Sequence, residues 1–255
     1  MIIFRLKKFS LLSKILKYLI FISFLLALDI ENYSIKNTLS FLNVEFKIVK
    51  NGTSPNRYIW LHGDEKTAEM ALNNHIKNYQ GIAFFIQNEE REIPYKSTII
   101  DPNRLFSREG AYHALKKFKP NWESKSLKDA LDEIEIEREN LLRSIMPLKN
   151  GILVSVHNNF RGYNIKSEIK NSQKVSIKDN QNPRDFILCT SEDDYIKLEK
   201  GPYNIVLQNK LPDEDDGSLS WALLKKNVRY INVETRLGYL SQQKKILSFI
   251  EKELN

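Results

Sequence analysis

The apolar and polar positions of this chain follow two spacings, one typical of strands and the other typical of helices. Short apolar runs rich in β-branched or aromatic residues, bounded by polar or turn residues, predict buried strands. They lie at residues 43–49, 57–61, 81–86, 151–156, 186–190, 203–207 and 229–233. Apolar residues three and four positions apart predict helices. These are expected at residues 66–79, 107–118, 126–145 and 240–254, with a short helix between the strands at 186–190 and 203–207.

Strands that alternate with helices predict an α/β fold. We expect a three-layer α/β/α arrangement around a mixed, partly parallel central sheet, of the kind found in zinc peptidases. The chain has 255 residues, of which 42% are hydrophobic and 28% charged, and this composition is that of a globular protein. That length is enough for one full hydrophobic core, so residues 29–255 are predicted to form a single domain.

Residues 1–28 differ from the rest of the chain. Five basic residues precede the apolar run at 18–28, which is the pattern of a secretory signal peptide. An uncleaved signal anchor is the alternative, since small residues do not form a clear cleavage site near Ala27. Either interpretation predicts that the domain lies outside the cytoplasm, in the periplasm or the extracellular space. A basic amphipathic helix on the inner leaflet is a third possibility.

Charge and cysteine content bear on two further properties, nucleic-acid binding and disulfide formation. The whole chain has 39 basic and 32 acidic residues, a net charge of +7. Without the five basic residues of the N-terminal segment, 34 basic residues face 32 acidic ones, a net charge of +2. This balance does not favour nucleic-acid binding, which needs a clustered basic face. Cys189 is the one cysteine and lies in an apolar run, so we expect a core residue without a disulfide.

Three of the predicted strands end in residues suited to metal chemistry. The strand at 57–61 is followed by His62-Gly63-Asp64-Glu65, which opens a helix. The strand at 151–156 ends at His157, and the strand at 229–233 ends at Glu234. In open α/β sheets, sites form beyond the carboxyl ends of the strands. These four side chains therefore converge if the strands are parallel neighbours, whereas alone His62 could be a core residue and Glu65 an ordinary acid of a first helical turn.

A further segment, Asp101-Pro102-Asn103-Arg104-Leu105-Phe106, lies between the first and second of these groups. Together with His-x-x-Glu, a later strand-end His and a late strand-end Glu, it resembles the zinc carboxypeptidases. The resemblance is stronger to their relatives, the succinylglutamate desuccinylases and aspartoacylases, and it extends from about residue 57 to residue 238. Asp64 stands where the desuccinylase branch usually has Asn.

The resemblance implies a role for each matching residue. The implied zinc ligands are His62, Glu65 and His157, and the open fourth position is typical of a catalytic zinc ion. The implied catalytic base is Glu234. An arginine that stabilises the oxyanion is implied as well, and Arg91 is the candidate.

The substrate-binding residues that the sequence suggests lie on either side of the second ligand group. By resemblance, Asn103 and Arg104 hold the carboxylate of the substrate, because a guanidinium pairs bidentately with a carboxylate. A salt bridge with Asp101 is the alternative for Arg104. Arg236 follows Glu234 closely and is a further candidate for substrate contact, although it could instead pair with Glu234. The acidic segment at 213–216 is expected to be a solvated loop that could flank the site.

The resulting hypothesis is an exported zinc metallohydrolase of the metallopeptidase class, similar to a carboxypeptidase or a deacylase. It would cleave an amide bond next to a carboxylate, in a peptide C-terminus or an N-acyl amino acid, by Glu-assisted attack of a zinc-activated water. Two alternatives remain open. One is a non-catalytic domain of the same fold that binds peptides or cell-wall fragments, and the other is a membrane-tethered structural protein without a metal.

Overall fold

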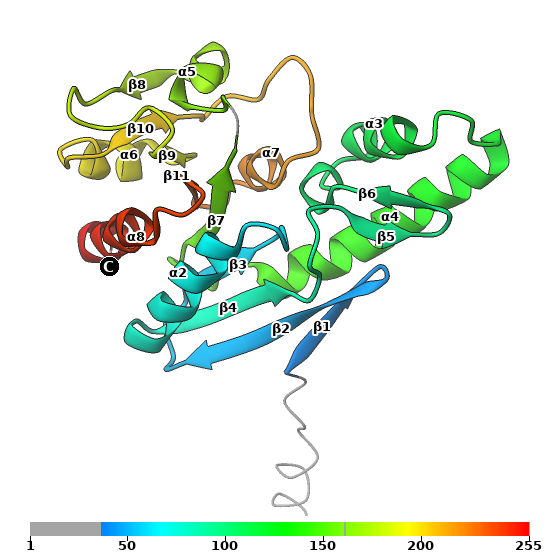
Figure 1. Cartoon of the computed structure of the whole chain (residues 1–255), viewed down its shortest axis with the longest axis horizontal. Coiled ribbons are helices and arrows are strands. Elements are labelled where there is room, and N and C mark those ends of the chain that lie inside the picture. Colours follow the sequence, from blue (N-terminus) through cyan, green and yellow to red (C-terminus); the bar gives the residue numbers. More distant parts are fainter. Residues whose placement is uncertain (1–36, 161, 255) are drawn as a thin grey trace, which may run out of the picture. The chain divides into compact units, whose positions relative to one another are not determined.

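The computed structural model describes residues 37–160 and 162–254 (Figure 1). The strands are β1 (Thr38–Phe41), β2 (Val44–Asn51), β3 (Arg57–Trp60), β4 (Gly81–Ile86), β5 (Ile93–Tyr95), β6 (Thr98–Ile100), β7 (Leu153–Asn159), β8 (Lys174–Ser176), β9 (Phe186–Cys189), β10 (Asn204–Leu207) and β11 (Tyr230–Arg236). The helices are α2 (Lys66–Asn78), α3 (Arg108–Phe118), α4 (Ser124–Ile145), α5 (Ile165–Glu168), α6 (Glu192–Leu198), α7 (Leu219–Lys225) and α8 (Leu240–Leu254), with the short 3₁₀ turns η1 (Pro102–Arg104) and η2 (Ile169–Asn171).

The predicted signal peptide or anchor, residues 1–28, lies outside the described residues. Within the described part of the chain, no helix combines the length and the apolar character that crossing a membrane requires.

The described strands form a nine-stranded mixed sheet with the order β1-β2-β4-β3-β7-β11-β9-β10-β8. The four strands from β4 to β11 in this order run parallel to one another. The strands β9 and β10 are parallel to each other and antiparallel to β11, and the outer strands β2 and β8 are also antiparallel to their inner neighbours. The prediction of a mixed, partly parallel central sheet is confirmed. The three strands whose ends carry the candidate chemistry, β3, β7 and β11, are adjacent.

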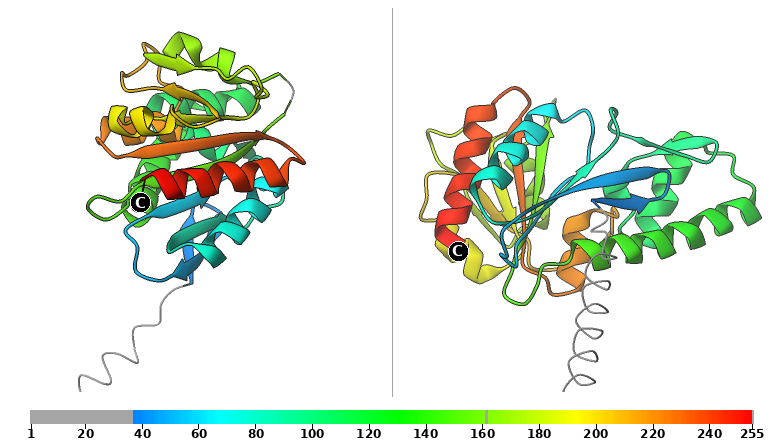
Figure 2. Two further views of the ribbon diagram at one scale, coloured as in Figure 1. Left: turned by 90° about the vertical axis from the view of Figure 1, so that its left-hand side faces the viewer. Right: turned by 90° about the horizontal axis from the view of Figure 1, so that it is seen from below.

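Helices cover both faces of this sheet. Figure 2 shows α2 and α8 side by side on one face, and α4 and α7 on the other. The helix α4 spans 22 residues, and its buried positions form one stripe that includes Ala130, Ile134, Arg138, Leu141 and Ile145. The spacing of three or four residues between them is the one from which this helix was predicted.

Several stretches of the chain contain structure that the apolar pattern did not predict. The polar segment after β4 includes the hairpin β5–β6, which forms its own two-stranded sheet. The helix α7 and the short elements α5 and β8 lie in segments with no regular apolar spacing. Elements of three to seven residues contain too few apolar positions to set a period, so their formation depends on tertiary packing.

Candidate functional site

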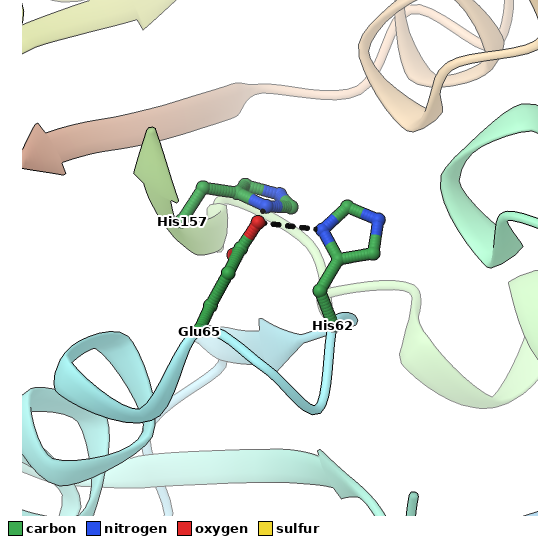
Figure 3. A group of neighbouring side chains, drawn as sticks. All are labelled: His62, Glu65 and His157. Carbon is green, nitrogen blue, oxygen red and sulfur yellow. Dashed lines mark hydrogen bonds and ion pairs between the residues drawn. The ribbon is translucent and has the colours of Figure 1, made fainter. Parts of the chain in front are cut away.

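The carboxylate of Glu65 lies between two histidine rings (Figure 3). Its Oε1 is 2.8 Å from Nδ1 of His62, and its Oε2 is 3.0 Å from Nδ1 of His157. All three side chains are buried, and their candidate ligand atoms lie within 4.8 Å of one another. Two imidazole nitrogens and a carboxylate at this separation could hold a metal ion.

A tight turn between β3 and α2 produces half of this group. His62 lies just beyond the carboxyl end of β3, and Glu65 occupies the N-cap position of α2. Gly63 separates them, and its backbone N–H donates to the carbonyl oxygen of Glu90 at 3.1 Å. A Cβ atom at Gly63 would lie 2.1 Å from the carbonyl oxygen of Asn88, a distance at which backbone would have to move. The turn therefore needs glycine at this position.

Asn158 joins the carboxyl end of β7 to the neighbouring elements through hydrogen bonds. Its backbone N–H donates to Oε2 of Glu65 at 3.1 Å, and its side-chain oxygen accepts from the N–H of Ala68 at 2.7 Å. Its Nδ2 donates to Thr235 at 3.1 Å and to Gln243 at 3.0 Å. One buried amide thus links β7 to α2, β11 and α8, and this linkage fixes the preceding residue, His157, against Glu65.

The outer nitrogen of His62 has a carboxylate partner. Its Nε2 is 2.9 Å from Oδ1 of Asp101, which also accepts the backbone N–H of Asn103 at 2.8 Å. A carboxylate on the outer nitrogen of a histidine is the usual way in which proteins orient a metal-binding imidazole. In contrast, Nε2 of His157 is buried and has no hydrogen-bond partner among the described residues.

In this group, the acidic and basic side chains shift the pKa values of one another. Burial by itself lowers the pKa of His62, but the carboxylates of Glu65 and Asp101 outweigh it and raise that pKa to about 9. Burial by itself raises the pKa of Glu65, but the neighbouring rings of His62 and His157 hold it well below its usual range. A buried anion is thereby balanced by a proton on the imidazole, and a metal cation could provide the same balance.

These donors are suited to a zinc ion. Two imidazoles and one carboxylate are a known ligand set of catalytic zinc, and both Nδ1 atoms face the same carboxylate. The Nε2 atom of His62 is engaged with Asp101, so its Nδ1 is the nitrogen directed toward Glu65 and the group's centre. The residues present therefore fit the metal that the sequence suggested.

Glu234 lies on β11 beside this group and lines the same cavity. Its side chain is buried, and burial raises its pKa to about 6. Oε1 accepts a hydrogen bond from Nδ2 of Asn232 at 3.1 Å, and Oε2 accepts one from Nδ2 of Asn159 at 3.5 Å. Glu234 forms no ion pair among the described residues, so the predicted alternative of a pair with Arg236 is wrong.

Arg91, the residue whose role the sequence defined least, lies at the site. Its Nη1 donates to Oε1 of Glu65 at 2.9 Å, and its Nη2 is 3.4 Å from Oδ2 of Asp101. The side chain is 38% exposed and lines the cavity. The loop after β4 therefore brings a guanidinium next to the candidate metal ligands.

Asn103 and Arg104 also line the cavity, but their polar groups differ in availability. Asn103 uses its side-chain oxygen to accept the N–H of Leu219 at 3.0 Å. The guanidinium of Arg104 is 39% exposed, and its ion-pair partner is Asp216 of the acidic loop, at 3.5 Å. The predicted alternative, a salt bridge from Arg104 to Asp101, is not formed. The acidic loop does flank the site, since Asp216 lines the cavity as well.

Arg236 is not brought to the cavity. Its guanidinium is held by the buried carboxylate of Asp185, with Nη2 2.8 Å from Oδ2 and Nε 3.1 Å from Oδ1. It also stacks on Tyr239, with Cζ 3.6 Å from the ring centroid. The physical reason is the antiparallel pairing of β11 with β9, which brings the residue before β9 beside the end of β11.

The cavity has a volume of about 780 Å³ and extends well beyond the residues that the sequence identified. Its remaining wall includes Tyr163, Glu168, Leu188, Gln208 and Trp221. One of these could have been found, because Gln208 directly follows the apolar run of β10, just as His157 ends the apolar run of β7. Tyr163, Glu168 and Trp221 lie in short or irregular segments with no such signal, and Leu188 is an apolar residue within the predicted strand at 186–190.

Comparison with known proteins gives distant likenesses only. No protein-family model matches the sequence, and no curated protein matches it. Three solved structures of Shewanella proteins with the provisional name metallopeptidase are similar to this chain. The S. baltica protein has 14% identity and a TM-score of 0.40, with 83% of this chain and 80% of that chain covered. The S. denitrificans protein has 11% identity and a TM-score of 0.44, with 85% of this chain and 81% of that chain covered. The S. amazonensis protein has 13% identity and a TM-score of 0.41, with 85% of this chain and 84% of that chain covered.

Proposed function

We propose that this protein is a zinc-dependent hydrolase that cleaves an amide bond next to a carboxylate, in a peptide C-terminus or an N-acyl amino acid. One observation supports this most strongly. The donor atoms of His62, Glu65 and His157 converge within 4.8 Å of one another, in a cavity that also holds the buried carboxylate of Glu234. This reaction needs at least a set of metal ligands and a nearby carboxylate of raised pKa.

Zinc would be held by His62, Glu65 and His157, and when bound it supplies Lewis-acid polarisation of a carbonyl and lowers the pKa of a water. Glu234 is the base in this proposal. Its pKa of about 6 leaves it ionised at neutral pH, yet close enough to neutrality to exchange a proton. The carboxylate takes a proton from the attacking water and later delivers it to the leaving nitrogen.

Two arginines would act on the substrate. Arg91 presents a half-exposed guanidinium beside Glu65, where it can donate to a carbonyl oxygen as negative charge develops there. Arg104 is 3.5 Å from Asp216 on the cavity wall, and this pair is partly exposed on both sides. A pair of this kind contributes little free energy, so a substrate carboxylate can replace Asp216 on the guanidinium. This is the basis for assigning substrate-carboxylate binding to Arg104.

The location of the protein rests on residues 1–28 alone. We propose export to the periplasm or the extracellular space, with the domain either released or anchored by that segment. A peptide outside the cytoplasm is then an accessible substrate.

The test is the zinc content of the full-length protein, measured by elemental analysis beside the variants His62→Ala and His157→Ala. Exposed His113 on α3 provides the matched control, His113→Ala. We expect one equivalent of zinc in the parent and the control, and its loss in both site variants, together with loss of hydrolysis of N-acyl amino acids or short peptides. A parent without zinc after reconstitution would overturn the proposal. Zinc binding without turnover of any such substrate would favour the non-catalytic peptide-binding domain instead.

A further inference from the structure

A further carboxylate, that of Glu168, lines the same cavity as the candidate metal ligands. Glu168 is the last residue of α5, and two neighbours hold its side chain. Its Oε1 accepts a hydrogen bond from the hydroxyl of Tyr163 at 2.6 Å, and its Oε2 accepts one from Nε2 of Gln208 at 2.5 Å. Gln208 is 1% exposed and immediately follows β10, so the carboxylate is anchored to the central sheet.

Both of these donors are neutral. Among residues 37–160 and 162–254, no lysine, arginine or histidine nitrogen lies within ion-pair distance of the Glu168 carboxylate. Two other acids of the cavity do have cationic partners, because Glu65 contacts two histidines and Arg91, and Asp216 faces Arg104. Glu234 and Asp64, which also line the cavity, resemble Glu168 in forming no ion pair among the described residues. The charge of Glu168 is therefore not balanced by a cation from the described residues. A half-buried, uncompensated carboxylate favours a cation in its vicinity.

The hydrogen bonds leave room for such a cation. A carboxylate has about four lone-pair positions, and Tyr163 and Gln208 use two of them. The two bonds also fix the orientation of the group, so little side-chain entropy is lost when a ligand binds. The cavity wall adds the apolar side chains of Leu188 and Trp221, which suit the alkyl part of a long basic side chain.

We propose that Glu168 makes the enzyme selective for substrates with a cationic side chain, an ammonium or a guanidinium, next to the cleaved bond. This inference rests on the proposed function for the reaction itself, and it adds the substrate class. The competing explanation is structural, because Glu168 also ties α5 to the end of β10. A purely structural role predicts a loss of stability that affects all substrates equally.

The experiment compares the zinc-loaded full-length protein with Glu168→Gln, which removes the charge and keeps the shape. Glu253→Gln, the same change at an exposed position on α8 outside the cavity, is the matched control. The substrates are N-acetylated dipeptides with lysine on either side of the bond, each paired with its norleucine counterpart, which has the same alkyl stem without the ammonium. We expect the parent and Glu253→Gln to favour lysine at one of the positions by about ten- to a hundredfold in kcat/KM, as a charge-assisted hydrogen bond would give.

In Glu168→Gln, the same ratio should fall to about one, because turnover of the lysine substrate drops while that of the norleucine substrate is retained. An equal rate on both members of each pair in the parent would overturn the inference and leave the hydrolase standing. An equal loss on both members in Glu168→Gln would also overturn it. If the parent cleaves none of the dipeptides, the failure belongs to the proposed reaction. The binding of the same peptides, measured by calorimetry, then tests the inference. Tighter binding of the lysine peptide in the parent, lost in Glu168→Gln, would support the inference, and equal binding of both peptides would contradict it.

Discussion

Glu234 and His157 are directly paired positions of the parallel strands β11 and β7. Paired residues on adjacent strands project from the same face of the sheet, about 5 Å apart at Cα. The proposed base and a proposed metal ligand are therefore held by the hydrogen-bonding register of two buried strands and not by a loop. A shift of one residue in that register would turn one of the two side chains to the opposite face, so their proximity is as stable as the sheet itself.

Substitution of Glu234 by Gln should abolish hydrolysis and leave the metal in place. The amide is nearly isosteric but cannot accept the proton, and general acid–base catalysis contributes about 10²- to 10⁴-fold. We expect a fall of that size in kcat for Glu234→Gln, with zinc content unchanged because Glu234 is outside the ligand group. Steady-state kinetics with elemental analysis measure both, and Glu253→Gln serves as the control. A variant with full activity would exclude Glu234 as the base.

The pH dependence of hydrolysis should follow the same carboxylate. Burial raises the pKa of Glu234 to about 6, and the ionised form is the one that acts as base. Hence kcat/KM should fall about tenfold per pH unit below pH 6 and level off above it. Asn232 donates to the ionised carboxylate, and this contact lowers the Glu234 pKa. In Asn232→Leu the acidic limb should therefore move to higher pH, while Asn140→Leu on the exposed face of α4 should leave it unchanged. A limb that stays in place in Asn232→Leu would contradict this assignment.

Zinc affinity should rise with pH. The pKa of His62 is raised to about 9 in the metal-free protein, so at neutral pH a proton must leave the ring before a metal can bind. Affinity should increase about tenfold per pH unit up to about pH 9 and then become constant. Asp101→Asn removes one of the carboxylates that raise this pKa, and the plateau should begin at a lower pH. Titration in chelator-buffered zinc measures the curve, with the exposed Asp129→Asn as control. Identical curves for the parent and Asp101→Asn would show that Asp101 does not act through His62.

Apolar runs and the residues that end them were sufficient to predict the centre of the site. They identified β3, β7 and β11 and the polar side chain that follows each apolar run, because a buried strand has a clear composition. The strands β7 and β11 themselves continue for two residues beyond His157 and Glu234. The adjacency of these strands was a hypothesis, since strand order depends on pairings between segments far apart in sequence. The insertion of β11 between β7 and β9 could not be predicted from local pattern.

The outer wall of the cavity could not be predicted for a different reason. Tyr163 and Glu168 belong to an irregular segment and a helix of four residues, where no periodicity marks which side chains face inward. Their hydrogen bonds to each other and to Gln208 arise only after α5 packs near β10. A single polar residue in such a segment has no distinguishing pattern, so this part of the cavity wall is harder to predict than the candidate metal ligands.

Removal of the Asn158 side chain should destabilise the protein. Asn158→Leu deletes the buried hydrogen bonds that the Asn158 side chain forms with Ala68, Thr235 and Gln243. At about 1 kcal/mol for each lost bond, the free energy of unfolding should fall by about 3 kcal/mol. Denaturant titration of the metal-free protein measures it. The exposed Asn140→Leu should change stability by less than about 0.5 kcal/mol. A loss in Asn158→Leu no larger than that would mean that the network contributes little.

The position of Arg236 predicts a structural role and not one in substrate binding. Its guanidinium pairs with Asp185, which is 2% exposed, and neither residue lines the cavity. Arg236→Met keeps much of the side-chain volume but leaves a buried carboxylate without its cation, a change that typically costs about 3 kcal/mol or more. We therefore expect a clear fall in the free energy of unfolding, with KM for an N-acyl amino acid within about twofold of the parent at a temperature where the variant is folded. Arg104→Met is the matched comparison, because its partner Asp216 is half-exposed and its guanidinium faces the cavity. The Arg104→Met variant should show the opposite pattern, with a tenfold or larger rise in KM and little loss of stability. If KM rises in Arg236→Met but not in Arg104→Met, Arg236 contacts the substrate and the structural assignment is wrong.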